Sequence, residues 1–260
     1  MSAIPAFTAI PRAAPVLSMR GVRKSFAKGL ARSVHRTLAL SDVDLDLWPG
    51  EIVALAGPEC AGKTTLLQCA AGLLRRDGGD MTWFGEAFAG GGCVPGVACV
   101  PAVPVFYPFL TVRDVLEYRA GREAIPRDRR AVAIDTALEQ LALSAISGNR
   151  IAQLSRDDIK RLAVAEALVC EPAAILMDTA TSDMCAAVSA TTCAALELYA
   201  ASGMAVMIAV RDPGDVAVAA SRIVMLGDGH IRRSFSLDSS GRSAFPLLPS
   251  ASRFVAETIH

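Results

Sequence analysis

The sequence predicts an α/β fold, in which short apolar strands alternate with helical segments along most of the 260 residues. The first observation is the apolar run Ile52–Ala56, which leads through a glycine-containing loop into a helical pattern. The second is a set of later apolar runs of strand length, at Ala173–Asp178, Met204–Val210 and Arg222–Leu226. Such alternation is typical of α/β proteins.

The composition is that of a globular protein, with 52% hydrophobic and 20% charged residues. A chain of this length can bury a full core, either as one large domain or as a domain with a subdomain. The net charge is zero, so no overall field attracts DNA or RNA, and we expect no nucleic-acid partner. The seven cysteines are scattered and mostly lie in apolar runs, which predicts buried thiols in a reducing cytosol.

The first half of the chain is expected to begin with a flexible leader at residues 1–15, because this stretch has neither the basic start nor the apolar core of a secretory signal. Alternation at Val16–Val22 and Leu38–Trp48 predicts two antiparallel strands. Between them we expect Ala27–Thr37 to form a solvated hairpin loop; the alternative is a basic flap near phosphates or anionic lipid.

The second half is expected to be rich in helices. Thr111 and Asp114 have the spacing of a capping box, and an apolar stripe of helical period follows from Ile134. We therefore expect an α-helical subdomain at about residues 103–169. A break at Ser202-Gly203 divides the next apolar stretch into a helix and a strand, so it is not a membrane span.

Beyond the strand at Met204–Val210, a short helix is expected around Val216–Ala220, before the strand at Arg222–Leu226. Residues 232–260 are rich in serine, and we expect them to form a C-terminal tail.

A phosphate-binding loop is predicted directly after the strand Ile52–Ala56. Such a loop needs glycines that turn backbone amides toward phosphates, a lysine for the β and γ oxygens, and a hydroxyl for Mg²⁺. The alternative is a glycine-rich turn without a ligand. The residues expected to bind the nucleotide are Gly57, Pro58, Glu59, Cys60, Ala61, Gly62, Lys63, Thr64 and Thr65.

Five further segments stand in order around this loop. They are Phe26, the runs at 100–113, 154–165 and 175–178, and Ala209-Val210-Arg211-Asp212-Pro213. In this order and spacing the chain resembles the nucleotide-binding subunit of an ABC transporter, over about residues 16–231.

The resemblance implies a P-loop NTPase with an ABC-type antiparallel β subdomain and an α-helical subdomain inserted between Walker A, at residues 57–65, and Walker B, at residues 175–178. It implies that Phe26 stacks on adenine and that Thr64 and Asp178 hold the Mg²⁺ of Mg-ATP. Core packing of Phe26 and a structural cap at Asp178 are the alternatives. The implied partners are a membrane-spanning transporter subunit and a second nucleotide-binding subunit, the same or different, at the cytoplasmic face of the cell membrane.

The motif positions that serve hydrolysis in the family carry other residues here. The family's glutamate polarises the attacking water, and such general-base help typically contributes about 10² to 10⁴ in rate. The family places glutamine at Ala102, Gly-Gly-Gln at Arg156-Asp157-Asp158, glutamate at Thr179, aspartate at Cys185 and histidine at Arg211. We therefore assign no catalytic residue, and we expect hydrolysis to be weak or absent.

The segment Leu154, Ser155, Arg156, Asp157 and Asp158 resembles the family's signature. In the family, glycine amides at this helix N-terminus close on the γ-phosphate of ATP held by the partner subunit. Here Ser155 and Asp158 have the spacing of a capping box, so the helix end is satisfied from within. Two carboxylates would also repel a triphosphate, although Arg156 offsets part of this. The alternative is an ordinary, well-capped helix start.

The sequence therefore favours a transporter subunit that binds Mg-ATP, docks on a membrane partner and hydrolyses little or nothing. One alternative is a conventional transport ATPase, which rests on the resemblance alone. Another is a regulator or scaffold outside transport that uses ATP as a structural ligand.

Overall fold

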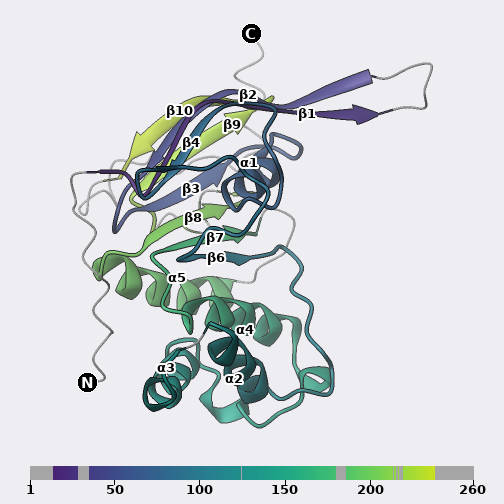
Figure 1. Ribbon diagram of the computed structural model, residues 1–260. Coiled ribbons are helices and arrows are strands. Elements are labelled where there is room, and N and C mark those ends of the chain that lie inside the picture. The colour runs from purple at the N-terminus through teal and green to yellow at the C-terminus, as the bar shows by residue number, and fades with distance from the viewer. Residues whose placement is uncertain are drawn as a thin grey trace.

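The computed structural model describes residues 14–28, 35–123, 125–179, 186–212, 214, 216 and 219–237. These residues form two β-sheets and a layer of helices (Figure 1). The termini of the chain fall outside the described part.

The larger sheet has the strand order β10-β9-β3-β8-β7-β6. Its strands β3, β6, β7, β8 and β9 run parallel, and β10 is antiparallel to β9. Alternate residues of β3 face two separate cores, because side chains along a strand point to opposite faces. The bounds are β3 Ile52–Ala56, β6 Val97–Val100, β7 Ala174–Asp178, β8 Ala205–Ala209, β9 Arg222–Gly227 and β10 His230–Ser236.

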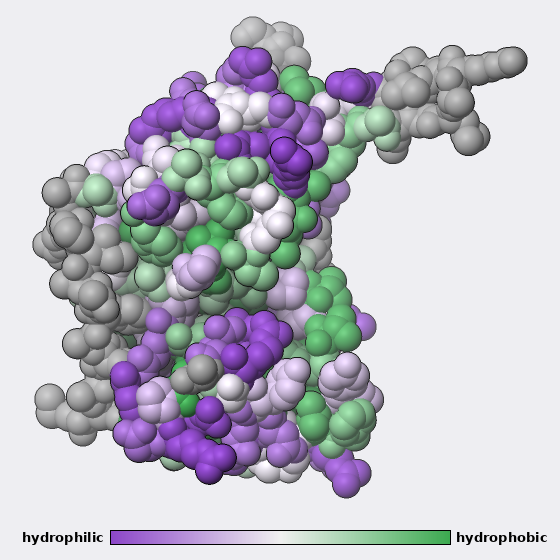
Figure 2. All heavy atoms as spheres, viewed as in Figure 1, coloured by the Kyte–Doolittle hydropathy of each residue, from purple (hydrophilic) through white to green (hydrophobic). Residues whose placement is uncertain are grey.

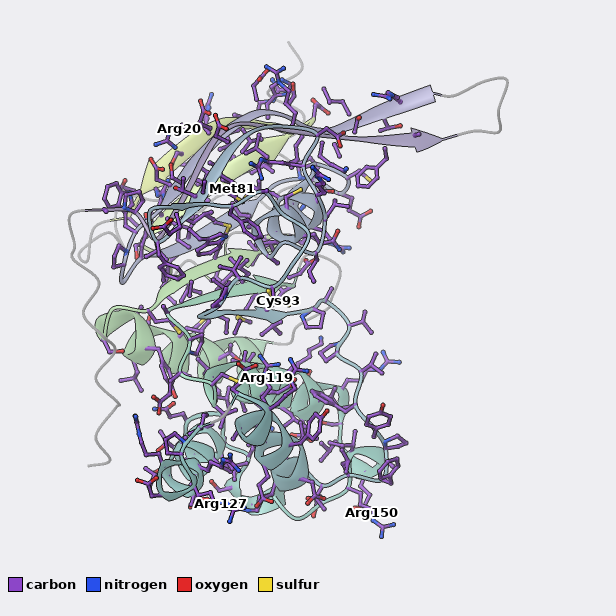
Figure 3. The ribbon with its side chains drawn as sticks, viewed as in Figure 1. Arg20, Met81, Cys93, Arg119, Arg127 and Arg150 are labelled. Atoms are coloured by element: carbon purple, nitrogen blue, oxygen red, sulfur yellow. The ribbon has the colours of Figure 1, made fainter. Side chains whose placement is uncertain are left out.

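The smaller sheet is antiparallel and has the order β2-β1-β4-β5. It covers one face of the larger sheet, with α1 (Lys63–Ala70) between the two layers (Figure 1). Met81, labelled in Figure 3, is buried in this core, and Trp83 Nε1 donates a 2.9 Å hydrogen bond to the Ala70 carbonyl of α1. The bounds are β1 Leu17–Lys28, β2 His35–Leu47, β4 Gly78–Trp83 and β5 Glu86–Ala87.

The other face of the larger sheet is covered by helices (Figure 1). The predicted capping box of α2 is confirmed: Thr111 Oγ1 accepts from the Asp114 amide at 3.1 Å, and the Thr111 amide donates to Asp114 Oδ2 at 2.8 Å. Ile134 is buried, as its stripe predicted. The bounds are α2 Val112–Arg122, α3 Arg127–Gln140, α4 Arg156–Leu168 and α5 Ala186–Ala201, with two short 3-10 helices at Ser144–Ile146 and Ile151–Gln153.

Two sequence expectations about the ends of strands were wrong. The hairpin strands run into the expected loop Ala27–Thr37, where Ala27 pairs with Arg36. The boundary after Ile231 falls inside β10, which continues to Ser236. A serine-rich composition does not prevent this, because the ladder to β9 is made by backbone groups.

Two further expectations concern the last third of the chain. The short helix expected around Val216–Ala220 lies partly outside the described residues. The apolar stretch divided at Ser202-Gly203 forms α5 and β8, as predicted. None of the helices in the described part of the chain is both long and apolar enough to cross a membrane.

Candidate functional site

The loop between β3 and α1 accepts only glycine at two of its positions. Gly57 has φ 149°, and a Cβ there would lie 2.1 Å from the Leu226 carbonyl oxygen. Gly62 has φ 103°, and its Cβ would lie 2.4 Å from the Ala39 oxygen. Side chains at either position would strain the backbone and meet other backbone atoms, so both glycines are needed for the loop to close over the sheet.

Lys63 is the first residue of α1 and is only 5% exposed. Its ammonium group donates to the carbonyl oxygens of Gly57, at 2.6 Å, and Pro58, at 2.7 Å. Burial lowers the pKa of Lys63, while the nearby carboxylates of Asp178 and Glu59 act in the opposite direction. The loop therefore encloses a cation among backbone carbonyls and two carboxylates.

The N-terminus of α1 is open. Gly62 is its N-cap, no side chain caps the first turn, and no acidic residue lies in that turn. The amides of a first turn and the positive end of the helix dipole favour an anion. Thr64 and Thr65 are half-buried in the same turn. The predicted order of strand, loop and helix is thus confirmed, and phosphate binding by this unit stays a prediction.

Asp178 lies at the same edge of the larger sheet as this loop. It ends β7 and is level with Ala209 of β8, which is level with Leu55 of β3, two residues before Gly57. Asp178 therefore lies at the same sheet edge as the phosphate loop, with β8 between its strand and β3, whereas Thr64 belongs to the first turn of α1. Hydroxyl and carboxylate oxygens are the donors that Mg²⁺ prefers, with one or two carboxylates and substrate phosphates completing its shell. The described residues contain no cluster of three or more His, Cys, Asp or Glu that could hold a metal by itself.

Thr179 follows Asp178 at the position of the family's glutamate. Its hydroxyl donates to the Ala209 carbonyl at 2.7 Å, and its amide donates to the same oxygen at 2.9 Å. These bonds join the ends of β7 and β8. The Thr179 side chain is thus engaged in strand pairing and supplies no carboxylate for a water molecule.

A small cavity next to Asp178 was not foreseen from the sequence. Thr192 of α5 lines it and is buried, and its Oγ1 has no hydrogen-bond partner among the described residues. Lys160 of α4 also lines this cavity. Thr192 lies in no motif, and the signature-like run 154–165 contains Lys160 without indicating that the fold brings it to this sheet edge. The cavity is lined by Val100, Pro101, Ala102, Pro104, Lys160, Val164, Met177, Asp178, Thr179 and Thr192.

Arg211 lies two residues beyond the end of β8, at the position of the family's histidine. Its Nη2 donates to Oε1 of Glu59, in the phosphate loop, at 2.6 Å. The two side chains are 58% and 76% exposed. The sequence motifs contain both residues but do not indicate their pairing, because 152 positions separate them in the chain.

The signature-like segment forms the start of α4, in the helical layer (Figure 1). Ser155 Oγ accepts from the Asp158 amide at 3.1 Å, and the Ser155 amide donates to Asp158 Oδ2 at 3.2 Å, so the predicted capping box is confirmed. Asp158 also bonds Arg161, and these bonds lower the pKa of Asp158 against an opposing effect of burial, which is the largest single influence. Leu154 packs against the helical core, and Asp157 adds a carboxylate to the first turn.

Phe26 lies near the end of β1 and is 41% exposed, so the alternative of core packing was wrong. Its ring has Lys24 Nζ 5.7 Å from the centroid. Lys24 is held in turn by Asp77, at 2.8 Å. The ring is therefore partly exposed, with the Lys24 ammonium group over it, and stacking on a purine stays a prediction.

Cys60 occupies the position of a family glycine and keeps a glycine-like backbone, with φ 61°. A non-glycine residue in this region carries strain of roughly 1–2 kcal/mol. Its side chain is exposed. Two motif residues named from the sequence, Cys185 and Pro213, lie outside the described residues.

Comparison with known proteins agrees with this geometry. The family model described as ABC transporter matches residues 40–182. The Fe(3+) ions import ATP-binding protein FbpC of Mesorhizobium japonicum is 31% identical over 210 residues, which cover 78% of this chain and 57% of that protein. The macrolide export ATP-binding/permease protein MacB 1/2 of Paracoccus denitrificans is 31% identical over 225 residues, which cover 84% of this chain and 33% of that protein. The chain thus spans a third to just over half of the length of these two relatives.

Solved structures show the same fold. The structure of an ATP-binding subunit of an ABC transporter has a TM-score of 0.73 at 20% identity, and the match covers 93% of this chain and 98% of that one. A dimeric ATP-binding cassette in a post-hydrolysis state, bound to ADP and Pi, has a TM-score of 0.71 at 23% identity, with 86% and 99% covered. The predicted fold class, a P-loop NTPase with an antiparallel β subdomain and a helical subdomain, is confirmed.

Proposed function

Because this chain belongs to the ABC transporter family, we propose that it is a transporter subunit that binds Mg-ATP and hydrolyses it weakly or not at all. One observation carries the proposal. An open helix N-terminus with a buried lysine lies at a sheet edge where Thr179, whose hydroxyl is bonded to the Ala209 carbonyl, stands at the position of the family's glutamate.

The binding half rests on the first turn of α1 and the residues around it. Its free amides and Lys63 supply the positive groups that a triphosphate needs, and Phe26 offers an exposed ring for the purine. Thr64 and Asp178 are the residues that would hold Mg²⁺, which when bound neutralises phosphate charge. The outline of the site is that of an ATP-binding cassette.

The hydrolysis half rests on the replaced positions. The Thr179 hydroxyl donates to the Ala209 carbonyl, and the side chain of Ala102 is only a methyl group. Arg211 is a permanent cation, which can bind phosphate but cannot relay a proton near neutral pH. The losses act on one chemical step, so their effects on rate should not simply be added.

A self-paired dimer would place the capped start of α4 opposite the phosphate loop of its partner. Neither of its two sites would then contain a base or a signature with free amides. Pairing with a relative that keeps the catalytic residues completes neither site. The site on the phosphate loop of this chain still lacks the family's glutamate, and the site on the partner's phosphate loop receives the capped α4. In both arrangements the protein is expected to bind ATP without completing a hydrolytic site.

Docking on a membrane-spanning partner is supported by an exposed apolar segment between β6 and α2. Four of its large side chains are 66–87% exposed, and the rings of Tyr107 and Phe109 lie 5.6 Å apart. Hydrophobic residues gather at the edge of the molecule where this segment runs (Figure 2). Exposed apolar patches mark interaction sites. The members are Val103, Val105, Tyr107 and Phe109. We expect this segment to meet the partner at the cytoplasmic face of the cell membrane.

Steady-state ATPase assays on purified protein test the proposal, with Lys63→Ala as the control for contaminating activity. We expect no Lys63-dependent turnover above background. Robust Lys63-dependent turnover would favour the conventional transport ATPase. Co-purification tests docking: a stable complex with a multi-span membrane protein supports it, and a solely soluble partner would favour the regulator or scaffold.

A further inference from the structure

Thr192 places a buried hydroxyl in α5, within the layer of helices that covers the larger sheet (Figure 1). The residue is 2% exposed, and its Oγ1 has no hydrogen-bond partner among the described residues. A threonine inside a helix often donates to the carbonyl four positions earlier, but Thr192 does not. Because a buried hydroxyl without a partner is costly, we expect one to be supplied from outside the chain.

The cavity next to Asp178 is the space in which this partner can lie. Its volume is about 20 Å³, and Thr192 forms part of its wall. A cavity of roughly 10–15 Å³ or more accommodates one water molecule, provided that two to four polar groups surround it. The cavity is therefore the size of a single water molecule.

Three side chains supply the polar groups that such a water molecule needs. Besides Thr192, the wall contains Asp178, at the end of β7, and Lys160 of α4, both half-buried. A carboxylate accepts from water, an ammonium group donates to it, and a hydroxyl does either. Asp178 is thereby placed within reach of α5 through a single bridging molecule.

The rest of the wall does not compete for this water molecule. Thr179 also lines the cavity, but its hydroxyl already donates to the Ala209 carbonyl at 2.7 Å. The other lining side chains are apolar, and they include Val100, Ala102, Val164 and Met177. The side-chain partners are therefore restricted to one hydroxyl, one carboxylate and one ammonium group.

We propose that the cavity binds one ordered water molecule, through which Thr192 holds the Asp178 carboxylate in the position needed for Mg²⁺. Thr192 is then a positioning residue that does not touch the nucleotide. Groups that hydrogen-bond a metal ligand fix its orientation and so strengthen metal binding. The positioning of Asp178 rests on the proposed function, because it requires Mg-ATP in the phosphate loop, whereas the water site does not.

Thermal unfolding without nucleotide tests the water site. Thr192→Val keeps the shape of the side chain but removes the hydroxyl. With water in the cavity, the variant loses a hydrogen bond, and the unfolding midpoint should fall by about 2–4 °C. A dry cavity predicts the opposite, because valine would replace a hydroxyl that has no partner. A midpoint that rises or stays the same would overturn the inference.

The dissociation constants of ATP with excess Mg²⁺ and with a chelator test the positioning of Asp178. Their ratio gives the factor by which Mg²⁺ tightens ATP binding. Thr192→Val should lower this factor about 3-fold to 10-fold and change Mg²⁺-free binding less than about 2-fold. Thr192→Ser keeps the hydroxyl, so it should retain the factor, although the lost methyl group lowers the unfolding midpoint.

Thr136→Val is the matched control, because Thr136 is a half-buried threonine of α3 that lines a different cavity of the helical layer. It should leave the Mg²⁺ factor unchanged. If Thr192→Val weakens ATP binding equally with and without Mg²⁺, or leaves the factor unchanged, the positioning role is overturned while the proposed function stands. If the wild type shows no Lys63-dependent binding of ATP, the proposed function fails together with the positioning role, and the unfolding midpoints still decide the water site.

Discussion

The N-termini of α1 and α4 differ in side-chain capping and in the charge of their first turns. α1 begins after a glycine N-cap, with no side-chain cap and no acid in its first turn. α4 begins with a reciprocal capping box and two acids in its first turn. An uncapped helix end attracts an anion, whereas a capped and acidic end has fewer free donors and repels one.

The comparison teaches that one protein can keep one half of a shared nucleotide site and lose the other. The phosphate loop keeps its glycines and buried lysine. The start of α4, which would contact the partner's nucleotide, instead bonds its own first-turn amide through the capping box. On the proposed function, nucleotide binding is thereby separated from hydrolysis, because the chain keeps the first and lacks the second. The next four predictions probe this separation, from the largest expected effect to the smallest.

The largest effect is expected from Lys63→Ala. The substitution removes the buried cation of the α1 site and leaves the Gly57 and Pro58 carbonyls without their donor. Mg-ATP binding should weaken about 100-fold or more, as measured by calorimetry, because charge-assisted bonds to phosphate are lost. Arg156→Ala removes a cation from the first turn of α4 and should leave Mg-ATP binding unchanged. Equal effects of the two substitutions would contradict the claim that only the α1 end binds the nucleotide.

A smaller effect is expected from Gly57→Ala, which tests the tight path of the phosphate loop. The added Cβ would meet the Leu226 oxygen at 2.1 Å, so we expect a loss of about 1–3 kcal/mol in the free energy of unfolding. Gly91→Ala is the control, because Gly91 also has a positive φ, of 86°, but open space around it. Chemical denaturation should show a clearly smaller loss there, and similar losses would mean that the close approach is unimportant.

The capping boxes of α4 and α2 provide the third prediction. Ser155→Ala removes the hydroxyl that accepts from the Asp158 amide, and should reduce stability by about 1 kcal/mol. Thr111→Ala removes the matching bond in α2 and should have a similar effect. Thermal unfolding measures both. If Ser155→Ala had no effect while Thr111→Ala did, the capping box would not stabilise the start of α4.

The smallest effect is expected from Cys60→Gly. It relieves the strain at φ 61° but adds backbone freedom to the unfolded chain, so we expect a net gain of about 0.5–1 kcal/mol. Ala142→Gly, at φ 53°, is the matched change outside the loop. Thermal unfolding should show similar gains for both, and a loss at Cys60 alone would indicate that the thiol stabilises the loop.

The same cysteine reports on occupancy of the α1 site. Maleimide labelling of Cys60 should weaken nucleotide binding, and bound ATP should protect the thiol. Cys93 and Cys99 are also exposed, so the Cys60→Gly variant is needed to subtract their reaction. Unchanged binding after complete labelling of Cys60 would show that this part of the loop is remote from the phosphates.

Much of the fold and of the α1 site could be predicted from the sequence, because both depend on local signals. Apolar runs of strand length and the spacing of glycines and lysine are read directly along the chain. The two capping boxes were predicted for the same reason, since their partners are three residues apart.

Features that join distant segments could not be predicted in this way. The pairing of Glu59 with Arg211 and the cavity that brings Lys160 to Asp178 depend on the order of strands in the sheet. The extension of β10 was missed because an edge strand needs only backbone bonds to its neighbour, and serine-rich composition does not reveal them.

The fate of bound nucleotide tests the central claim most directly. The protein is loaded with Mg-ATP labelled on the γ-phosphate, separated from free nucleotide, and the bound species is identified over time. The account predicts that the bound nucleotide remains ATP until it dissociates, and that Lys63→Ala retains none. Rapid appearance of bound ADP and released labelled phosphate in the wild type would contradict it.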